Sequence, residues 1–180
     1  MTCIVGLVNN LGVWIGADSA SIDSYWTVSN RKDKKIFQNS KFLIGYTTSF
    51  RMGQLLYCAN LNIEHPPKMN NFMFMVSKFI PVVKKSLQDG DWEKKQDNRA
   101  EGGEFLVGYK GELYQIDTDF QVQWCKKYSA AGCGEQVALG SLYSTRDIVD
   151  DGPGRLKMAL QAAAAHNCGV RTPFTVQKLL

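Results

Sequence analysis

The order of strand-like and helix-like segments is the feature of this sequence that most restricts its fold. Two groups of strand-like apolar runs are each followed by segments with the 3.6-residue spacing of amphipathic helices, and a short strand-like run ends the chain. The order is therefore strands, two helices, strands, two helices and a strand. Antiparallel hairpins that need one face covered, with two helix pairs to cover them, predict an α+β fold in which a sheet-on-sheet core lies between helical layers.

The strands are predicted from β-rich runs that are separated by turn residues. Asn9, Asn10, Leu11 and Gly12 lie between two such runs and tolerate the positive φ of a tight turn, which predicts a β-hairpin. A third buried strand is expected at 42–48, with a short strand before it at 35–38. The remaining strands are expected at 104–109, 112–117, 120–124 and 174–180.

Four helices are predicted from apolar spacing and capping residues. Ser49 is a plausible N-cap for the first, whose apolar stripe extends to Ile63. The second covers 70–87, and Pro81 should kink or divide it because proline lacks the backbone N–H of a helix interior. The other two are expected at 134–144 and 153–167, and the polar stretch 88–103 is expected to be a mobile surface loop.

Length and composition indicate one globular domain, 1–180. Lys and Arg number 21 against 17 for Asp and Glu, a formal charge of +4 that is scattered along the chain and does not favour nucleic-acid binding. No apolar run approaches the ~18 residues of a membrane span, and Met1 is followed by strand-like sequence instead of a signal peptide, so we expect a cytoplasmic protein.

Cysteine and histidine do not indicate a disulfide framework or a metal site. The five cysteines are an odd number without CxxC spacing, which is typical of reduced thiols. His65 and His166 lie far apart without ligand spacing, and His166 is expected to be a helix-end residue. We therefore expect neither a structural metal nor a cofactor.

Several segments, taken in order, resemble one family. TCIVGLVNNLGVWIGADSAS, KKIFQ, FLIGYTTSF and AAGCGEQ are similar to the proteasome β-subunit family, which includes the bacterial HslV peptidases, and the resemblance covers nearly the whole chain. It implies the four-layer αββα sandwich of the N-terminal nucleophile hydrolases. It also implies that an N-terminal threonine, exposed when the preceding residue is removed, is the nucleophile.

The resemblance assigns roles to individual residues. Thr2 would be the nucleophile, and its α-amino group, with a pKa near ~8 once Met1 is removed, would be the base. Lys35 would hold the Thr2 hydroxyl in a positive field, and Asp18 would orient Lys35. Lys34 is an equally close candidate by spacing, and Lys35 is preferred because it immediately precedes Ile36 and Phe37. The backbone N–H of Thr48 would bind the oxyanion.

The positions that support the nucleophile depart from the family pattern. Thr48 stands where the family usually has glycine, and Cys133 stands where it has the serine of a GSG turn. Asn167 and Val170 align with a later Asp-x-x-Ser that supports the threonine amine, so a negative charge and a hydroxyl are lost. Losses of this kind commonly reduce activity by ten- to a hundredfold or more, so an enzyme and a retired site both remain open.

Two function classes follow. The first is a threonine-type peptidase that self-associates into rings, cleaves polypeptide and works with an unfoldase. The second is a catalytically silent structural or assembly subunit with the same fold, because FRMGQLL, LVGYKGELYQID and GVRTPFTV are similar to short phage-encoded proteasome-like proteins. Phage particle proteins would then be its partners, in the host cytoplasm or the virion. An N-terminal amidohydrolase acting on small amides is disfavoured, because nothing in the sequence specifies a small polar pocket.

Overall fold

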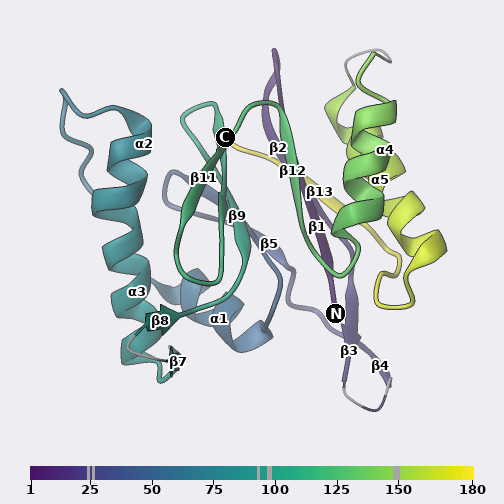
Figure 1. Cartoon of the computed structure of the whole chain (residues 1–180), viewed down its shortest axis with the longest axis horizontal. Coiled ribbons are helices and arrows are strands. Elements are labelled where there is room, and N and C mark those ends of the chain that lie inside the picture. Colours follow the sequence, from purple (N-terminus) through teal and green to yellow (C-terminus); the bar gives the residue numbers. More distant parts are fainter. Residues whose placement is uncertain (24, 26, 93, 97–98, 148–150) are drawn as a thin grey trace.

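Two antiparallel sheets pack face to face and carry helices on both outer faces, which gives the four layers seen in Figure 1. The structure is a computed structural model that describes residues 1–23, 25, 27–92, 94–96, 99–147 and 151–180. The predicted α+β sandwich with two antiparallel sheets between helix layers is confirmed. Within the described residues, no helix is long and apolar enough to cross a bilayer.

The first sheet has the strand order β12-β1-β2-β13. Its hairpin joins β1 to β2 through a tight turn, with Asn9 opposite Gly12 and Gly12 at a φ of 130° that favours glycine. The helices α4 and α5 cover its outer face. These elements span Cys3–Asn9 (β1), Gly12–Ala17 (β2), Tyr128–Gly132 (β12), Glu135–Ser144 (α4), Gly152–His166 (α5) and Thr175–Lys178 (β13).

The second sheet has the strand order β11-β10-β9-β6-β5, and all its neighbours are antiparallel. Its outer face carries the other helical layer, and its aromatic core includes Phe42, Phe74 and Tyr109, all fully buried. The strands span Ile36–Asn39 (β5), Phe42–Tyr46 (β6), Phe105–Tyr109 (β9), Glu112–Ile116 (β10) and Val122–Cys125 (β11).

The helix layer over the second sheet differs in two places from two continuous helices. The first helix, α1 (Phe50–Cys58), begins at the predicted cap Ser49 but ends before the predicted Ile63. The Asn39 side chain donates hydrogen bonds to the carbonyls of Leu56, Tyr57 and Ala59, which terminates the helix there.

The second helix is divided, as the position of Pro81 predicts. It consists of α2 (Asn71–Phe74), a π-helical turn η1 (Met75–Phe79) and α3 (Ile80–Asp89). The N–H of Ile80 donates to the carbonyl of Met75, five residues back, so the wider turn lies immediately before Pro81.

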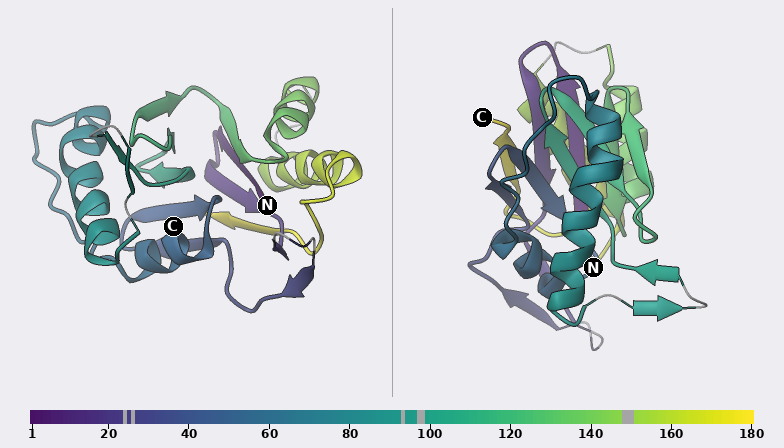
Figure 2. Two further views of the ribbon diagram at one scale, coloured as in Figure 1. Left: turned by 60° about the horizontal axis from the view of Figure 1, so that its bottom comes forward. Right: turned by 90° about the vertical axis from the view of Figure 1, so that its left-hand side faces the viewer.

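Two small hairpins project from the sandwich at the end where the N-terminus lies (Figure 2). One pairs β3 (Ala20–Ile22) with β4 (Val28–Asn30), and the other pairs β7 (Lys94–Gln96) with β8 (Arg99–Glu101). The segment 88–103 was expected to be a mobile surface loop, and its residues 94–96 and 99–101 instead form the paired strands β7 and β8. Residues 93, 97 and 98 lie outside the described residues.

Glycines on the inner faces allow the two sheets to approach closely. A Cβ on Gly45 of β6 would lie 2.7 Å from a methyl carbon of Ile15 on β2, and one on Gly6 of β1 would lie 2.8 Å from Leu113 on β10. Real Cβ atoms do not occupy such positions without displacement of the neighbour. The spacing between the sheets therefore depends on these missing side chains.

Candidate active site

Four of the predicted site residues lie at one end of the sandwich, at the ends of strands from both sheets. Thr2 precedes β1 and Asp18 follows β2, and these ends are adjacent because Ile4 pairs with Ala17. Lys35 precedes β5 and Thr48 follows β6, and Ile36 pairs with Gly45 in the same way. The site is therefore assembled across the gap between the two sheets.

A buried ion pair bridges the sheets. The Lys35 ammonium lies 3.0 Å from Asp18 Oδ1, and the two side chains are 3% and 0% exposed. Lys34 is exposed and makes no ion pair among the described residues, so Lys35 is the lysine that faces Asp18. Burial lowers the pKa of Lys35, and the Asp18 carboxylate opposes that shift.

Backbone donors complete the surroundings of Asp18. The N–H of Cys3 donates to Asp18 Oδ1 at 2.9 Å, and the N–H of Ala20 donates to Oδ2 at 2.8 Å. A longer bond of 3.4 Å comes from the N–H of Arg171, which precedes β13. Asp18 thus fixes β1, immediately after Thr2, relative to the lysine of the other sheet.

Thr2 is 6% exposed and is held by its neighbours. Its hydroxyl donates to the carbonyl of Met1 at 2.6 Å, and no hydrogen bond joins it to Lys35 within the described part of the chain. Its N–H donates to Cys133 Sγ at 3.3 Å, and the Cys133 thiol donates back to the Thr2 carbonyl at 3.3 Å. With Met1 attached, the Thr2 nitrogen is an amide and has no basic lone pair.

Thr48 adopts the left-handed conformation that glycine would take without strain. Its φ is 59°, an outlier for a β-branched residue. Its hydroxyl accepts a hydrogen bond from the N–H of Glu104 at 3.0 Å. Among the described residues its own N–H donates to no acceptor, so it is available to an incoming oxyanion.

Among the described residues, the two altered positions near the end of α5 make no hydrogen bond to Thr2. Asn167 donates to the carbonyl of Cys133 at 2.6 Å and accepts from the N–H of Gly169 at 2.8 Å, so it acts on Thr2 only through Cys133. Val170 is fully buried in the apolar cluster between the first sheet and its helices. His166 is the last residue of α5.

The sequence interpretation did not single out the small residues that surround Thr2. A Cβ on Gly132, which has a φ of 92°, would lie 2.3 Å from the Thr2 carbonyl oxygen and 2.8 Å from Thr47 Oγ1. A Cβ on Gly169 would lie 2.6 Å from Met1 Cβ and 2.9 Å from Cys133 Sγ. The glycines beside Cys133 were the available signal, because they mark a close approach of two backbones.

The site contains thiols but no arrangement for a metal. All five cysteines are free, and within the described ranges no group of three or more His, Cys, Asp or Glu side chains could hold a metal ion. Burial and the charge of Asp18 raise the pKa of the Cys3 thiol to about 12, so Cys3 is a neutral packing residue beside the ion pair.

Neither a protein-family model nor a curated protein matches the sequence. Among solved structures, BPH of Thiobacillus denitrificans matches with a TM-score of 0.79, at 17% identity in its complex with epoxomicin, where 99% of this chain and 100% of that chain are covered. A second structure of Thiobacillus denitrificans BPH matches with a TM-score of 0.79 at 18% identity, covering 99% of both chains.

HslV from Trypanosoma brucei matches with a TM-score of 0.69 at 16% identity, covering 98% of both chains. BPH is a bacterial HslV-like proteasome subunit, so all three matched structures are of HslV or HslV-like proteins. At these identities the similarity establishes the fold, over almost the full length of each chain. The chain has the HslV-like fold of the proteasome-type N-terminal nucleophile hydrolases.

Proposed function

We propose that this chain is a self-associating, proteasome-like subunit that hydrolyses polypeptide with Thr2 after Met1 has been removed. The observation that carries the proposal is the buried Lys35–Asp18 pair, which bridges the two sheets beside Thr2. Burying two charges costs several kcal/mol per ion before their attraction is counted. A buried ion pair is therefore weak evidence that the pair stabilises the fold, and it is better evidence that these residues form a functional site.

The chemistry needs one change in the chain. Hydrolysis of the Met1–Thr2 peptide bond converts the Thr2 amide nitrogen into an amine with a pKa near ~8, and it frees the hydroxyl from the Met1 carbonyl. The amine takes the hydroxyl proton as the oxygen attacks a substrate carbonyl, and it then gives that proton to the substrate's amide nitrogen. The C–N bond breaks, the C-terminal part of the substrate leaves as an amine, and its N-terminal part stays as an acyl ester on Thr2. Water hydrolyses that ester and regenerates the hydroxyl.

The other residues support this reaction electrostatically. The Lys35 ammonium supplies a positive field at the start of β5 and is held in place by Asp18. The free N–H of Thr48 donates to the oxyanion that forms on the substrate carbonyl. Cys133 orients the backbone of Thr2, and Asn167 positions Cys133.

The experiment combines N-terminal chemistry with activity. We expect mass spectrometry of protein from its native source to find chains that begin at Thr2, and we expect such chains to cleave an unfolded polypeptide. Thr2→Ala should abolish cleavage, and Thr2→Ser should retain part of it. Met1 retained on every chain, or a fully active Thr2→Ala variant, would contradict the proposal. Because one BPH structure holds epoxomicin, loss of epoxomicin binding in Thr2→Ala is a second readout.

Self-association and its partners belong to the same proposal. We expect sedimentation of the purified protein at micromolar concentration to find an assembly of the size of a ring. In this proposal the ring works in the host cytoplasm, where an unfoldase supplies it with extended polypeptide. A monomer at every concentration tested would exclude the chambered form of the function while leaving the chemistry at Thr2 testable.

A second candidate is a catalytically silent assembly subunit, including a phage virion component. It is favoured by the hydrogen bond of the Thr2 hydroxyl to the Met1 carbonyl and by the packing of Met1 near Gly169 and Cys133. Under this function Met1 stays in place, and the chain occurs stoichiometrically in a particle. An unchanged phenotype of Thr2→Ala, with the protein visible in particles by electron microscopy, distinguishes it from the peptidase.

A further inference from the structure

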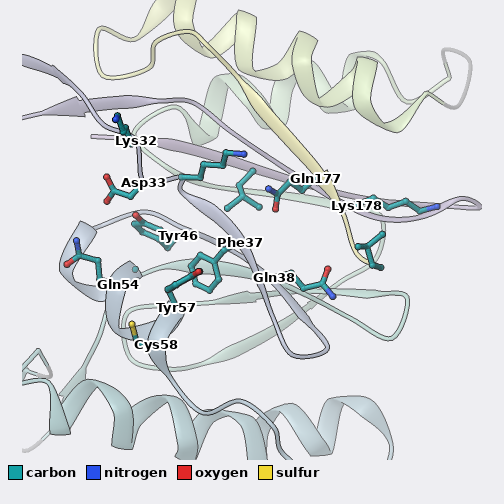
Figure 3. Close-up of a pocket in the computed structure, with 14 residues that line it drawn as sticks. Lys32, Asp33, Phe37, Gln38, Tyr46, Gln54, Tyr57, Cys58, Gln177 and Lys178 are labelled. Carbon is teal, nitrogen blue, oxygen red and sulfur yellow. The ribbon is translucent and has the colours of Figure 1, made fainter.

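Side chains at the end of β6 point in two directions. Tyr46, the last residue of β6, lines a cavity beside α1 and β5 (Figure 3). Thr47 follows it and does not line that cavity. Successive side chains of an extended chain point to opposite faces, so Thr47 faces the first sheet, where its Oγ1 atom lies near Gly132.

The hydroxyl of Thr47 is buried and unpaired. Thr47 is 6% exposed, its backbone N–H donates to the Glu104 carbonyl at 3.1 Å, and its carbonyl accepts from the N–H of Ser49 at 2.6 Å. Its Oγ1 atom makes no hydrogen bond in the part of the chain that the structure describes. A buried hydroxyl without a partner is costly, so this one calls for an explanation.

Thr47 Oγ1 and the carbonyl of Thr2 border the same small space. This is the space that a side chain on Gly132 would fill, because a Cβ there would lie 2.8 Å from Thr47 Oγ1 and 2.3 Å from the Thr2 carbonyl oxygen. The same point is 3.2 Å from the Thr2 carbonyl carbon, so the carbonyl oxygen is directed at it. A hydroxyl that can donate and a carbonyl that can accept therefore lie close together beside an absent side chain.

The hydrogen bonds that hold Thr2 in this structure depend on Met1 and on a thiol. The Thr2 carbonyl accepts from the Cys133 thiol at 3.3 Å, and a thiol is a weak donor. The Thr2 hydroxyl donates to the Met1 carbonyl at 2.6 Å, and this bond is lost when Met1 is removed. A carbonyl oxygen has two lone pairs, so the Thr2 carbonyl can accept from a second donor without losing the thiol.

We propose that Thr47 is a positioning residue for Thr2: once Met1 has been removed, the Thr47 hydroxyl donates a hydrogen bond to the Thr2 backbone carbonyl. This inference rests on the proposed function of Thr2. The bond satisfies the buried hydroxyl and holds the Thr2 backbone, so that the new α-amine stays within reach of the hydroxyl whose proton it takes. Thr47 touches neither the substrate nor the reacting atoms.

Chains that begin at Thr2, made by cleaving a fusion protein immediately before Thr2, test the proposal. We expect their crystal structure to place Thr47 Oγ1 within ~3.2 Å of the Thr2 carbonyl oxygen. Thr47→Val exchanges the hydroxyl for a methyl group and should lower kcat for an unfolded polypeptide about tenfold with KM unchanged, because Thr47 acts on the nucleophile and not on substrate binding. Thr47→Ser keeps the hydroxyl and should keep most of the wild-type kcat.

Thermal unfolding gives a readout that does not require activity. In chains cleaved before Met1 the Thr47 hydroxyl is unpaired, so Thr47→Val should not lower the thermal midpoint. In chains that begin at Thr2 the same variant loses a hydrogen bond, so its midpoint should fall by about 2–4 °C. A residue with a merely structural role would change both chains alike.

Thr145→Val is the matched control. Thr145 is the C-cap of α4, and its hydroxyl donates to the Ser141 carbonyl at 2.9 Å, at the opposite end of α4 from Cys133. This variant makes the same chemical change, so we expect it to lower the thermal midpoint of both chains and to leave kcat unchanged.

Three results overturn the proposal: a Thr47 hydroxyl that is not bonded to the Thr2 carbonyl in chains that begin at Thr2, a Thr47→Val variant with the wild-type kcat, or a Thr47→Val midpoint that shifts equally in both chains. A wild-type chain that begins at Thr2 and cleaves nothing refutes the proposed function instead. The crystal structure and the thermal midpoints then still decide whether Thr47 holds Thr2.

Discussion

Replacing Asp18 by Asn tests how the site is held together. The change leaves the Lys35 ammonium, whose side chain is 3% exposed, without an anion. Breaking one side of a buried pair costs about 3–5 kcal/mol. The Asn side chain has one acceptor oxygen for the N–H groups of Cys3 and Ala20, so a further ~1–2 kcal/mol is lost. The total of about 4–7 kcal/mol is a large part of the ~5–15 kcal/mol that stabilises an ordinary domain.

A double variant separates the charge effect from general damage. Lys35→Met in the Asp18→Asn background removes the orphaned charge and fills the same space, so we expect it to restore about 2 kcal/mol relative to Asp18→Asn alone. Urea unfolding followed by the fluorescence of the four tryptophans, at one protein concentration, measures each variant. Additive losses, or a loss below 1 kcal/mol for Asp18→Asn, would refute the reasoning.

The pH dependence of the free energy of unfolding tests the same ion pair independently. The folded-state pKa of Lys35 is below its ordinary value of 10.5, so between these two pKa values the unfolded chain binds more protons and stability rises with pH. Without Asp18 the folded-state pKa falls further, so the rise should begin at lower pH in Asp18→Asn. It should be absent from the double variant, which has no lysine at this position.

Three further changes test single features of the structure. Thr48→Asn keeps an acceptor for the Glu104 N–H and tolerates a φ of 59°, so thermal unfolding should show a gain of about 0.5–1 kcal/mol. Gly53→Ala places a Cβ 2.1 Å from Tyr46 Cζ, so overpacking of ~1–3 kcal/mol should exceed the helix-propensity gain of ~1 kcal/mol and lower stability in urea. The Cys3 thiol has its pKa raised to about 12 from 9.0, so its own contribution to stability should fall by ~1.4 kcal/mol per pH unit between pH 9 and 12; the stability of wild type relative to Cys3→Ala should fall by this amount over that range.

Each of these has a result that would contradict it. The prediction for Thr48 is contradicted if Thr48→Asn is less stable than wild type while Thr48→Val is as stable as wild type. Thr48→Val is the control here, because it removes the acceptor and keeps the β-branch. Gly53→Ala would have to raise the urea midpoint. Cys3→Ala would have to lose stability above pH 9 as steeply as wild type.

Local chemistry explains which parts of the fold the sequence could predict. The β1–β2 hairpin follows from its turn residues, and the interruption of the second helix follows from Pro81. Strand β12, Tyr128–Gly132, was missed because YSAAG has few β-branched or large apolar residues, and its strand conformation depends on pairing with β1. The paired strands β7 and β8 were missed because they lie in a polar, glycine-flanked segment.

The candidate site, like the fold, could be predicted from the sequence only in part. The positions of Thr2, Asp18 and Lys35 follow from spacing within a resemblance, and Lys35 was preferred over Lys34 only from the apolar residues that follow it. The packed sheets place Lys35, and not Lys34, beside Asp18. Whether Lys35 acts on the Thr2 hydroxyl, and whether Thr48 binds an oxyanion, stay predictions.

The missing side chains at Gly6 and Gly45 have a consequence for how this site can be lost. Asp18 belongs to one sheet and Lys35 to the other, so the spacing that these glycines allow also sets the Lys35–Asp18 distance of 3.0 Å. We expect a methyl group added at either glycine, although it contacts no reacting atom, to lengthen this distance while the strands and helices stay formed. Core positions that never meet a substrate are therefore under the same constraint as the site itself, and an inactive relative could retain every site residue and still have lost its function between the sheets.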